Sequence, residues 1–269
     1  MSKAAHVVRQ SRTNRGVEPL IAGGMDNPVD VVFTPGGERF FTTTFLTHPG
    51  RGERDGLIHA VYGGVYGKIH APMEAAPRTG DVLPPLAHLG AAAPCGLACY
   101  QSPGWGPEFE GQLLACLFNM RKVTLHQLVP QGAGFVTRNR DLVVSESLDF
   151  HPTDVLEDAD GSILVLDTGG WYKLCCPTSQ LAKPDVLGGI YRLKKTAAPT
   201  VADPRGRQVD FAALDAAAAA RLAADPRPAV WQQAQSRLVA LGEPAVPAGS
   251  GPGRGVPQQA GHRGDRRLT

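Results

Sequence analysis

The chain contains the same hairpin pattern twice, and this repeat restricts the fold more than any other feature. "NPVDVVFTPGGERFFTTTF" begins at Asn27 and "HPTDVLEDADGSILVLDTG" begins at His151. Sliding one onto the other by 124 positions places Pro28 on Pro152 and Asp30 on Asp154. Each copy has a short strand, a glycine-containing turn and a second strand rich in β-branched or aromatic residues, the pattern of a β-hairpin. The repeat therefore predicts two equivalent hairpins.

Each hairpin is followed by a third strand pattern, "GLIHAVYG" in the first copy and "GGIYRLKK" in the second. A weaker middle copy reads "APCGLACYQS" and then "GQLLACLFNMRKVTLHQLV". Three meanders in series predict an all-β fold, a partial β-propeller over 1–196 with about three to four visible blades. A β-sandwich made from the same hairpins is the alternative. Because propellers close with about four to eight blades, we expect a fragment of a ring, unless 7–23 and other segments complete a smaller one.

Composition supports many turns and excludes some partners. The 32 glycines and 23 prolines favour loops over long helices, while 42% hydrophobic residues are enough for a core. A net charge of +2 gives no basis for binding nucleic acid through bulk electrostatics. No apolar run reaches the roughly 18 to 20 residues of a transmembrane helix, and the first residues lack the apolar centre of a signal peptide.

The composition changes after residue 196. "VDFAALDAAAAARLAADP" and "RPAVWQQAQSRLVALGEPAV" have helical spacing and strong helix formers, with a break at Asp225 and Pro226. They predict a HEAT-like helical hairpin over 197–248. The Gly-, Pro- and Arg-rich stretch 249–269 is expected to be a disordered tail.

The strings "DFHPTDVLEDADGSILVLDTGGWYKLCCPTSQLAKPDVLGGIYRLKK", "RDGLIHAVYGGVYGK" and "FNMRKVTLHQL" resemble one bacterial group. It consists of large planctomycete-type propeller proteins described as membrane-bound dehydrogenases, and the resemblance covers 16–195. Their propeller looks like that of the pyrroloquinoline quinone (PQQ) dependent sugar and sorbosone dehydrogenases.

The resemblance implies a quinoprotein-like oxidoreductase that oxidises a sugar or a related alcohol or aldehyde. It implies PQQ and Ca²⁺ as cofactors and a cytochrome c-type electron acceptor, although the chain has no Cys-x-x-Cys-His haem motif. It also implies that full-length relatives are periplasmic or membrane-associated. The alternative is a non-catalytic propeller module that binds carbohydrate or protein partners.

Oxidation of a sugar hydroxyl requires a base, and His151 is the leading candidate. Asp149 and Asp154 lie beside it in the sequence, and a carboxylate could orient its imidazole. The other interpretation of "HPTD" is a turn that begins a blade. The repeat favours this second role for Asp154, because Asp30 occupies the equivalent position, whereas His151 replaces Asn27 and leaves both roles open.

Two further groups are candidates for binding a cofactor or metal. Asn119, Arg121 and Lys122 follow a strand and could hold the carboxylates of an anionic cofactor, although a solvated basic turn is the more common meaning. Asp149 and Asp167, together with main-chain oxygens, are the candidate calcium ligands. "EDADG" lacks the full calcium-loop pattern and is assigned to a turn.

The stretch "WYKLCCPTSQ" is not part of the repeat and is interpreted as an inserted loop. Trp171 and Tyr172 either form the wall of a cofactor site or cap a blade. Cys175 and Cys176 are adjacent, and they are either two free thiols or a strained, reducible disulfide. The cofactor-binding prediction includes all four residues.

Overall fold

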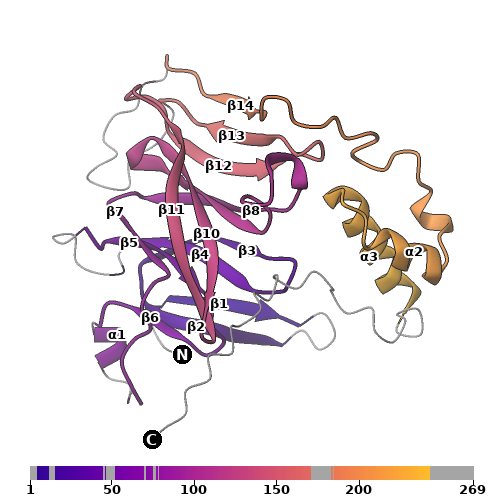
Figure 1. Ribbon diagram of the computed structural model, residues 1–269. Helices are drawn as coiled ribbons and strands as arrows, with labels where there is room; N and C mark the ends of the chain where they lie inside the picture. Colours follow the sequence, from indigo (N-terminus) through magenta and orange to yellow (C-terminus); the bar gives the residue numbers. More distant parts are fainter. Residues whose placement is uncertain are drawn as a thin grey trace, which may run out of the picture.

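The structure, a computed structural model, describes residues 5–11, 16–44, 46, 52–69, 71–74, 77, 79–170, 183 and 185–242. These residues form a series of β-sheets stacked one on the next, followed by two helices that lie to one side of the stack (Figure 1). The sheets are separate and form no closed barrel among the described strands. The all-β prediction is confirmed, and the arrangement fits a partial, propeller-like fold.

The two predicted hairpins form the cores of two equivalent sheets. The second sheet contains β3 (Asn27–Phe33), β4 (Arg39–Thr44), β5 (Asp55–His59) and β7 (Ala87–Gly90) in that order. The fourth sheet contains β12 (Pro152–Glu157), β13 (Ile163–Asp167) and β14 (Gly189–Leu193). In both, the ladder shifts register just after the aligned proline, between Pro28 and Val31 and between Pro152 and Asp154. The repeat is therefore structural down to this irregularity.

The weak middle copy forms the third sheet. It contains β8 (Pro94–Tyr100), β9 (Gln112–Leu117), β10 (Lys122–Gln131) and β11 (Gly134–Val144), all antiparallel. A register shift again follows its first proline, between Pro94 and Leu97. Short 3-10 turns at Pro103–Trp105 and Phe118–Met120 flank β9.

The first sheet has a different topology. A hairpin of β1 (Ala5–Gln10) and β2 (Val17–Gly24) is joined in parallel by β6 (Val65–Gly67), which follows the second sheet's third strand in the sequence. The four-residue helix α1 (Ala71–Glu74) comes next.

The cores lie between successive sheets, as expected for stacked blades. Phe41 and Ile58 pack against Ile21 between the first two sheets. The innermost strands β3, β8 and β12 lie side by side, so the three meanders share one edge. This shared edge is the feature that favours a propeller over a sandwich, because all three meanders begin there.

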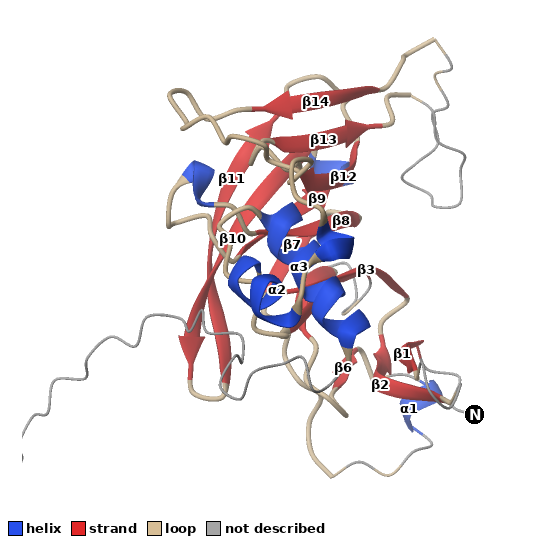
Figure 2. Cartoon of the chain, turned by 90° about the vertical axis from the view of Figure 1, so that its right-hand side faces the viewer, coloured by secondary structure: helices blue, strands red, loops and turns tan. Residues whose placement is uncertain are grey.

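The C-terminal region forms two helices, α2 (Ala216–Leu222) and α3 (Pro228–Leu241), after a 3-10 turn at Phe211–Ala213. Asp215 caps α2 through the Ala218 amide at 2.7 Å, and a proline begins α3, as the predicted break requires. Figure 2 shows the two helices from their own side, lying against each other in front of the sheets. They pack through the buried side chains Ala219, Val230, Ala234 and Leu238.

The two predicted helices are confirmed, whereas the HEAT-like assignment stays a prediction. None of the described helices is long and apolar enough to cross a membrane.

Candidate functional site

The predicted site residues meet at one end of the stacked sheets. Because neighbouring strands are antiparallel, the links β7–β8, β9–β10, β11–β12 and β13–β14 all emerge at the same end. We call this the loop end and define it by 91–93, 118–121, 145–151 and 168–170. Its segments are in contact: among other links, the Asn119 amide donates to the Ala92 carbonyl at 2.9 Å, and the rings of Phe118 and His151 lie 4.6 Å apart.

His151 is held in one orientation by the main chain. Its Nδ1 lies 3.0 Å from the carbonyl oxygen of Asp149 and 3.0 Å from that of Gly169. A nitrogen facing two acceptors must carry the proton, so the neutral ring has its lone pair on Nε2. Phe118 covers the ring at an interplanar angle of 38°. The side chain is half-buried.

The two neighbouring acids have structural partners instead of contacting the imidazole. The carboxylate of Asp149 forms an ion pair with Lys183 at 2.5 Å. The Oδ1 of Asp167 accepts the amides of His151 at 2.9 Å and Gly169 at 2.8 Å. Asp167 thus fixes the backbone around the histidine, and main-chain carbonyls, not a carboxylate, orient the imidazole.

Asp154 lies further along β12 and belongs to the strand edge. Its Oδ1 accepts the amide of Val155 at 2.8 Å, as the Oδ1 of Asp30 accepts that of Val31 at 2.8 Å. Burial raises the pKa of Asp154, and the nearby Asp30 charge adds to this effect. Asp154 therefore has the same structural role as Asp30, which is the role that the alignment of the two copies favours.

The basic turn has mixed roles. Asn119 Nδ2 donates to the Ala91 carbonyl at 3.3 Å, and Lys122 pairs with Asp141 across the strands at 2.9 Å. Arg121 adopts a left-handed conformation, with φ of 55°. Its Nε is buried and has no hydrogen-bond partner in the described part of the chain. Arg121 is therefore the residue of this turn that has a buried polar atom without a partner among the described residues.

Trp171, Tyr172, Cys175 and Cys176 lie outside the described residues. The remaining cysteines, Cys95, Cys99 and Cys116, are free thiols in the third sheet. Burial raises the pKa of Cys95 to about 11 and that of Cys99 to about 12, which keeps both thiols protonated and unreactive at neutral pH.

Two residues of the loop end were missed by the sequence reasoning. Phe118 precedes the basic turn and packs against the ring of His151, and its aromatic character was the one signal of such a role. Gly169 supplies a carbonyl to the imidazole from a left-handed conformation, with φ of 59°, that favours glycine. The sequence contains the glycine but cannot show where its carbonyl points.

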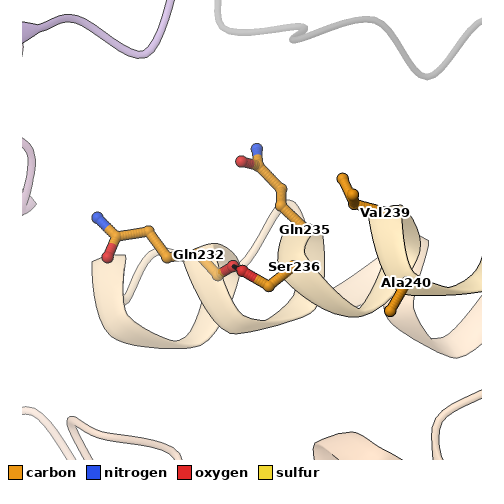
Figure 3. Close-up of a pocket in the computed structure, with 5 residues that line it drawn as sticks. All are labelled: Gln232, Gln235, Ser236, Val239 and Ala240. Atoms are coloured by element: carbon orange, nitrogen blue, oxygen red, sulfur yellow. Dashed lines mark hydrogen bonds between the residues drawn. The ribbon is translucent and has the colours of Figure 1, made fainter. Parts of the chain in front are cut away.

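The described hollows are not at His151. One of about 670 Å³ is lined only by α3, through Gln232, Gln235, Ser236, Val239 and Ala240 (Figure 3). It contains no ionisable side chain among these described residues. A second, of about 320 Å³, lies between β11 and β14 and has a mainly apolar lining that includes Phe150 and Tyr191. His151 itself lines neither hollow, although Ser145 and Phe150 of the loop end line the second.

The described residues alone form neither a complete calcium site nor a complete binding site for a quinone. They contain no group of three or more His, Cys, Asp or Glu side chains arranged to hold a metal. The carboxylates of Asp149 and Asp167 are already bonded to an ammonium and to amides. In the basic turn, Lys122 and Asn119 are likewise bonded to neighbouring groups. No reaction step is therefore assigned to either cofactor.

Comparison with known proteins gives limited structural matches. No protein-family model and no curated protein matches the sequence. A glucose dehydrogenase from Thermus thermophilus matches with a TM-score of 0.40 and 19% identity, over 58% of this chain and 43% of that one. Another glucose dehydrogenase matches with a TM-score of 0.42 and 18% identity, over 58% and 45%.

The soluble aldose sugar dehydrogenase of Escherichia coli, in its apo form, matches with a TM-score of 0.40 and 18% identity, over 58% and 46%. The matched region therefore spans less than half the length of each of these proteins. All three are sugar dehydrogenases by name.

Proposed function

We propose that this chain carries part of the active site of an oxidoreductase that acts on a sugar or a related alcohol or aldehyde. The observation that supports it is the orientation of His151. Two main-chain carbonyls fix its tautomer, and Phe118 packs against the ring. The carboxylate of Asp167 holds the backbone at His151 by accepting its amide. An imidazole is the side chain best suited to remove a hydroxyl proton near neutral pH, because it changes charge in that range.

In this proposal the substrate hydroxyl donates its proton to Nε2 of His151. The resulting imidazolium is stabilised because Nδ1–H already faces the carbonyl oxygens of Asp149 and Gly169. Both nitrogens then carry protons, and no proton has to move across the ring. His151 thus acts as a general base without a carboxylate partner.

The sequence resemblance suggests PQQ as the electron acceptor, Ca²⁺ as its companion and a cytochrome as the next carrier. We propose these as finer features of the same function, along with a periplasmic or membrane-associated location. Arg121, whose Nε is buried without a partner among the described residues, is the residue proposed to contact an anionic cofactor.

The test is dye-linked sugar oxidation by the chain with added PQQ and Ca²⁺, comparing wild type with His151→Asn and His151→Ala. Asparagine keeps a donor near the position of Nδ1 but removes the base. We expect both variants to lose roughly 10²- to 10⁴-fold in turnover, with the Asn variant keeping the wild-type melting temperature. Unchanged turnover in His151→Asn would exclude His151 as the base.

The second candidate function is a non-catalytic module that binds carbohydrate or protein. The pairing of Asp149 with Lys183 and of Lys122 with Asp141 favours it, because these candidate site residues already serve the fold. Calorimetry separates the two candidates. Sugar binding without dye reduction at any quinone concentration supports the module, and quinone-dependent turnover supports the enzyme.

A further inference from the structure

Two of the free thiols in the third sheet lie opposite each other on neighbouring strands. Cys95 is on β8 and Cys116 is on β9, and these strands are antiparallel. The register shifts between Pro94 and Leu97, so two residues of β8, Cys95 and Gly96, lie opposite Cys116. Because Gly96 has no side chain, Cys95 supplies the side chain that lies opposite Cys116.

The two thiols also face the same side of the sheet. Cys116 is completely buried in the core between the third and fourth sheets, and the half-buried Cys95 packs against the same core. Burial raises the pKa of Cys116, and the charge of the nearby Cys95 adds to this effect. A charge effect of this kind falls with distance, so it agrees with the opposed positions of the two residues on the ladder.

This placement suits a disulfide bond. Residues directly opposite each other in an antiparallel pair have Cβ atoms about 4.5 to 5.5 Å apart. A disulfide joins Cβ atoms that are about 3.5 to 4.5 Å apart. The strands would have to approach only slightly, at a point where the bulge already interrupts the ladder of hydrogen bonds.

The third described thiol of this sheet is placed differently. Cys99 lies on β8 opposite Leu113, and it is buried in the core between the second and third sheets. Its side chain and that of Cys116 therefore lie on opposite faces of the sheet. Cys99 is a matched internal control, because it shares the strand and the burial of the other thiols but not their face.

We propose that Cys95 and Cys116 form a site of reversible oxidation, at which a cross-strand disulfide joins β8 to β9. Two S–H bonds break and one S–S bond forms. The two protons and two electrons pass to a two-electron oxidant, which in the experiment below is a diazene that becomes a hydrazine. The product is a chain with one disulfide in the core between the third and fourth sheets.

The bond would lie next to the loop end. Cys95 follows the link that contains Ala93, and Cys116 precedes Phe118 by two residues. The oxidised chain would therefore have the start of β8 tied to the end of β9, close to the ring that packs against His151. The proposal does not depend on sugar oxidation, because the disulfide requires only the two thiols and an oxidant.

Burial controls the rate of this oxidation. It raises the pKa of Cys95 to about 11, so little of the reactive thiolate is present at neutral pH. Cys95 is the more exposed of the two and should react first, after which the Cys116 thiol completes the bond. Below this pKa the thiolate fraction rises about tenfold for each pH unit, and we expect the rate of oxidation to rise with it.

The test is oxidation of the folded chain with diamide at about pH 9, where more thiolate is present. Cys175→Ser and Cys176→Ser form the background, so that the three thiols of the third sheet are the ones counted. We expect the chain to become lighter by two hydrogen atoms and to lose two thiols when these are counted in denaturant. Adding Cys99→Ser should leave this result unchanged, whereas adding Cys95→Ser or Cys116→Ser should abolish the mass loss.

The linked pair is also identified without any substitution in the sheet. The oxidised background chain is cleaved after Glu108 and Glu110, and tandem mass spectrometry of the linked peptides should identify Cys95 joined to Cys116. Circular dichroism spectra of the serine variants check that each of them is folded. A background chain that keeps its full mass, a bond that involves Cys99, or a bond between two chains would overturn the proposal.

Discussion

The second and fourth sheets grow from the same hairpin sequence but have different surroundings. The second is covered on both faces, and its Phe40 is completely buried. Among the described residues, the fourth packs against the third sheet on one face only, and its Ile190 is mostly exposed. The same pattern of residues therefore forms the same strands and turns in both places. What differs is the neighbour, and with it how much each side chain contributes to stability.

The largest difference is expected for the aligned pair Phe40 and Leu164. Phe40→Ala removes a fully buried ring that packs against Phe135 and His59, and it should lower the free energy of unfolding by about 3 to 5 kcal/mol. Leu164→Ala, on the open face, should lower it by less than about 1.5 kcal/mol. Urea unfolding of both variants measures the difference. Equal losses would show that the fourth sheet is covered.

The next effect concerns the glycine that replaces aspartate in the middle copy. Gly96 lies at the position of Asp30 and Asp154, and a Cβ there would meet the Asp154 Oδ1 at 2.2 Å and its Cα at 2.6 Å. Gly96→Ala should therefore cost about 1 to 3 kcal/mol through forced displacement of β12. Gly36→Ala, where the nearest atom is 3.8 Å away, is the matched control. Equal free energies of unfolding for the two variants in urea would contradict the close approach of β8 and β12 at Gly96.

A third, smaller effect separates the two aspartates. In Asp30→Asn one oxygen is replaced by an amide, so the Val31 and Leu97 amides cannot both be accepted. The expected loss is about 1 to 3 kcal/mol. In Asp154→Asn the single bond to Val155 survives, and the change should lie within about 0.5 kcal/mol. Thermal unfolding of the two variants at neutral pH compares the two losses. Similar losses would contradict the prediction, because they would mean that the second oxygen of Asp154 also accepts a hydrogen bond.

Sequence alone could predict the copies of the repeat but not all of their strands. The hairpins and third strands of the second and fourth sheets fall where the alignment of the two copies placed them. β11 was missed because the polar run "TRNRD" interrupts the apolar residues of "GFVTRNRDLVV", which lies at an exposed sheet edge. β7 was missed because four residues give no period. The parallel pairing of β6 with β2 joins segments far apart in the chain, which no local pattern encodes.

The sequence predicted which residues belong to the candidate site, but not how their side chains and main-chain groups are arranged. The alignment of the copies separated His151 from the repeat because Asn27 occupies its place in the other copy. It could not show that carbonyls of Asp149 and Gly169, and not a carboxylate, hold the imidazole. Main-chain groups have no residue type, so a sequence contains no signal for them.

The smallest effect lies at the hairpin tips, where the fourth sheet has Asp160 and the second has Gly36. The hydrogen bond from the Ser162 side chain, with help from the Ser162 amide and Lys194, lowers the pKa of Asp160 to about 2. An unfolded aspartate titrates near about 3.9. The stabilisation from the ionised form is therefore complete above about pH 4 and is lost as pH falls toward about 2. Asp160→Asn should flatten the dependence of unfolding free energy on pH in that window, whereas Gly36→Ala should leave the slope unchanged. An unchanged slope in Asp160→Asn would show that Asp160 adds no charge-dependent stability to the tip of the fourth sheet.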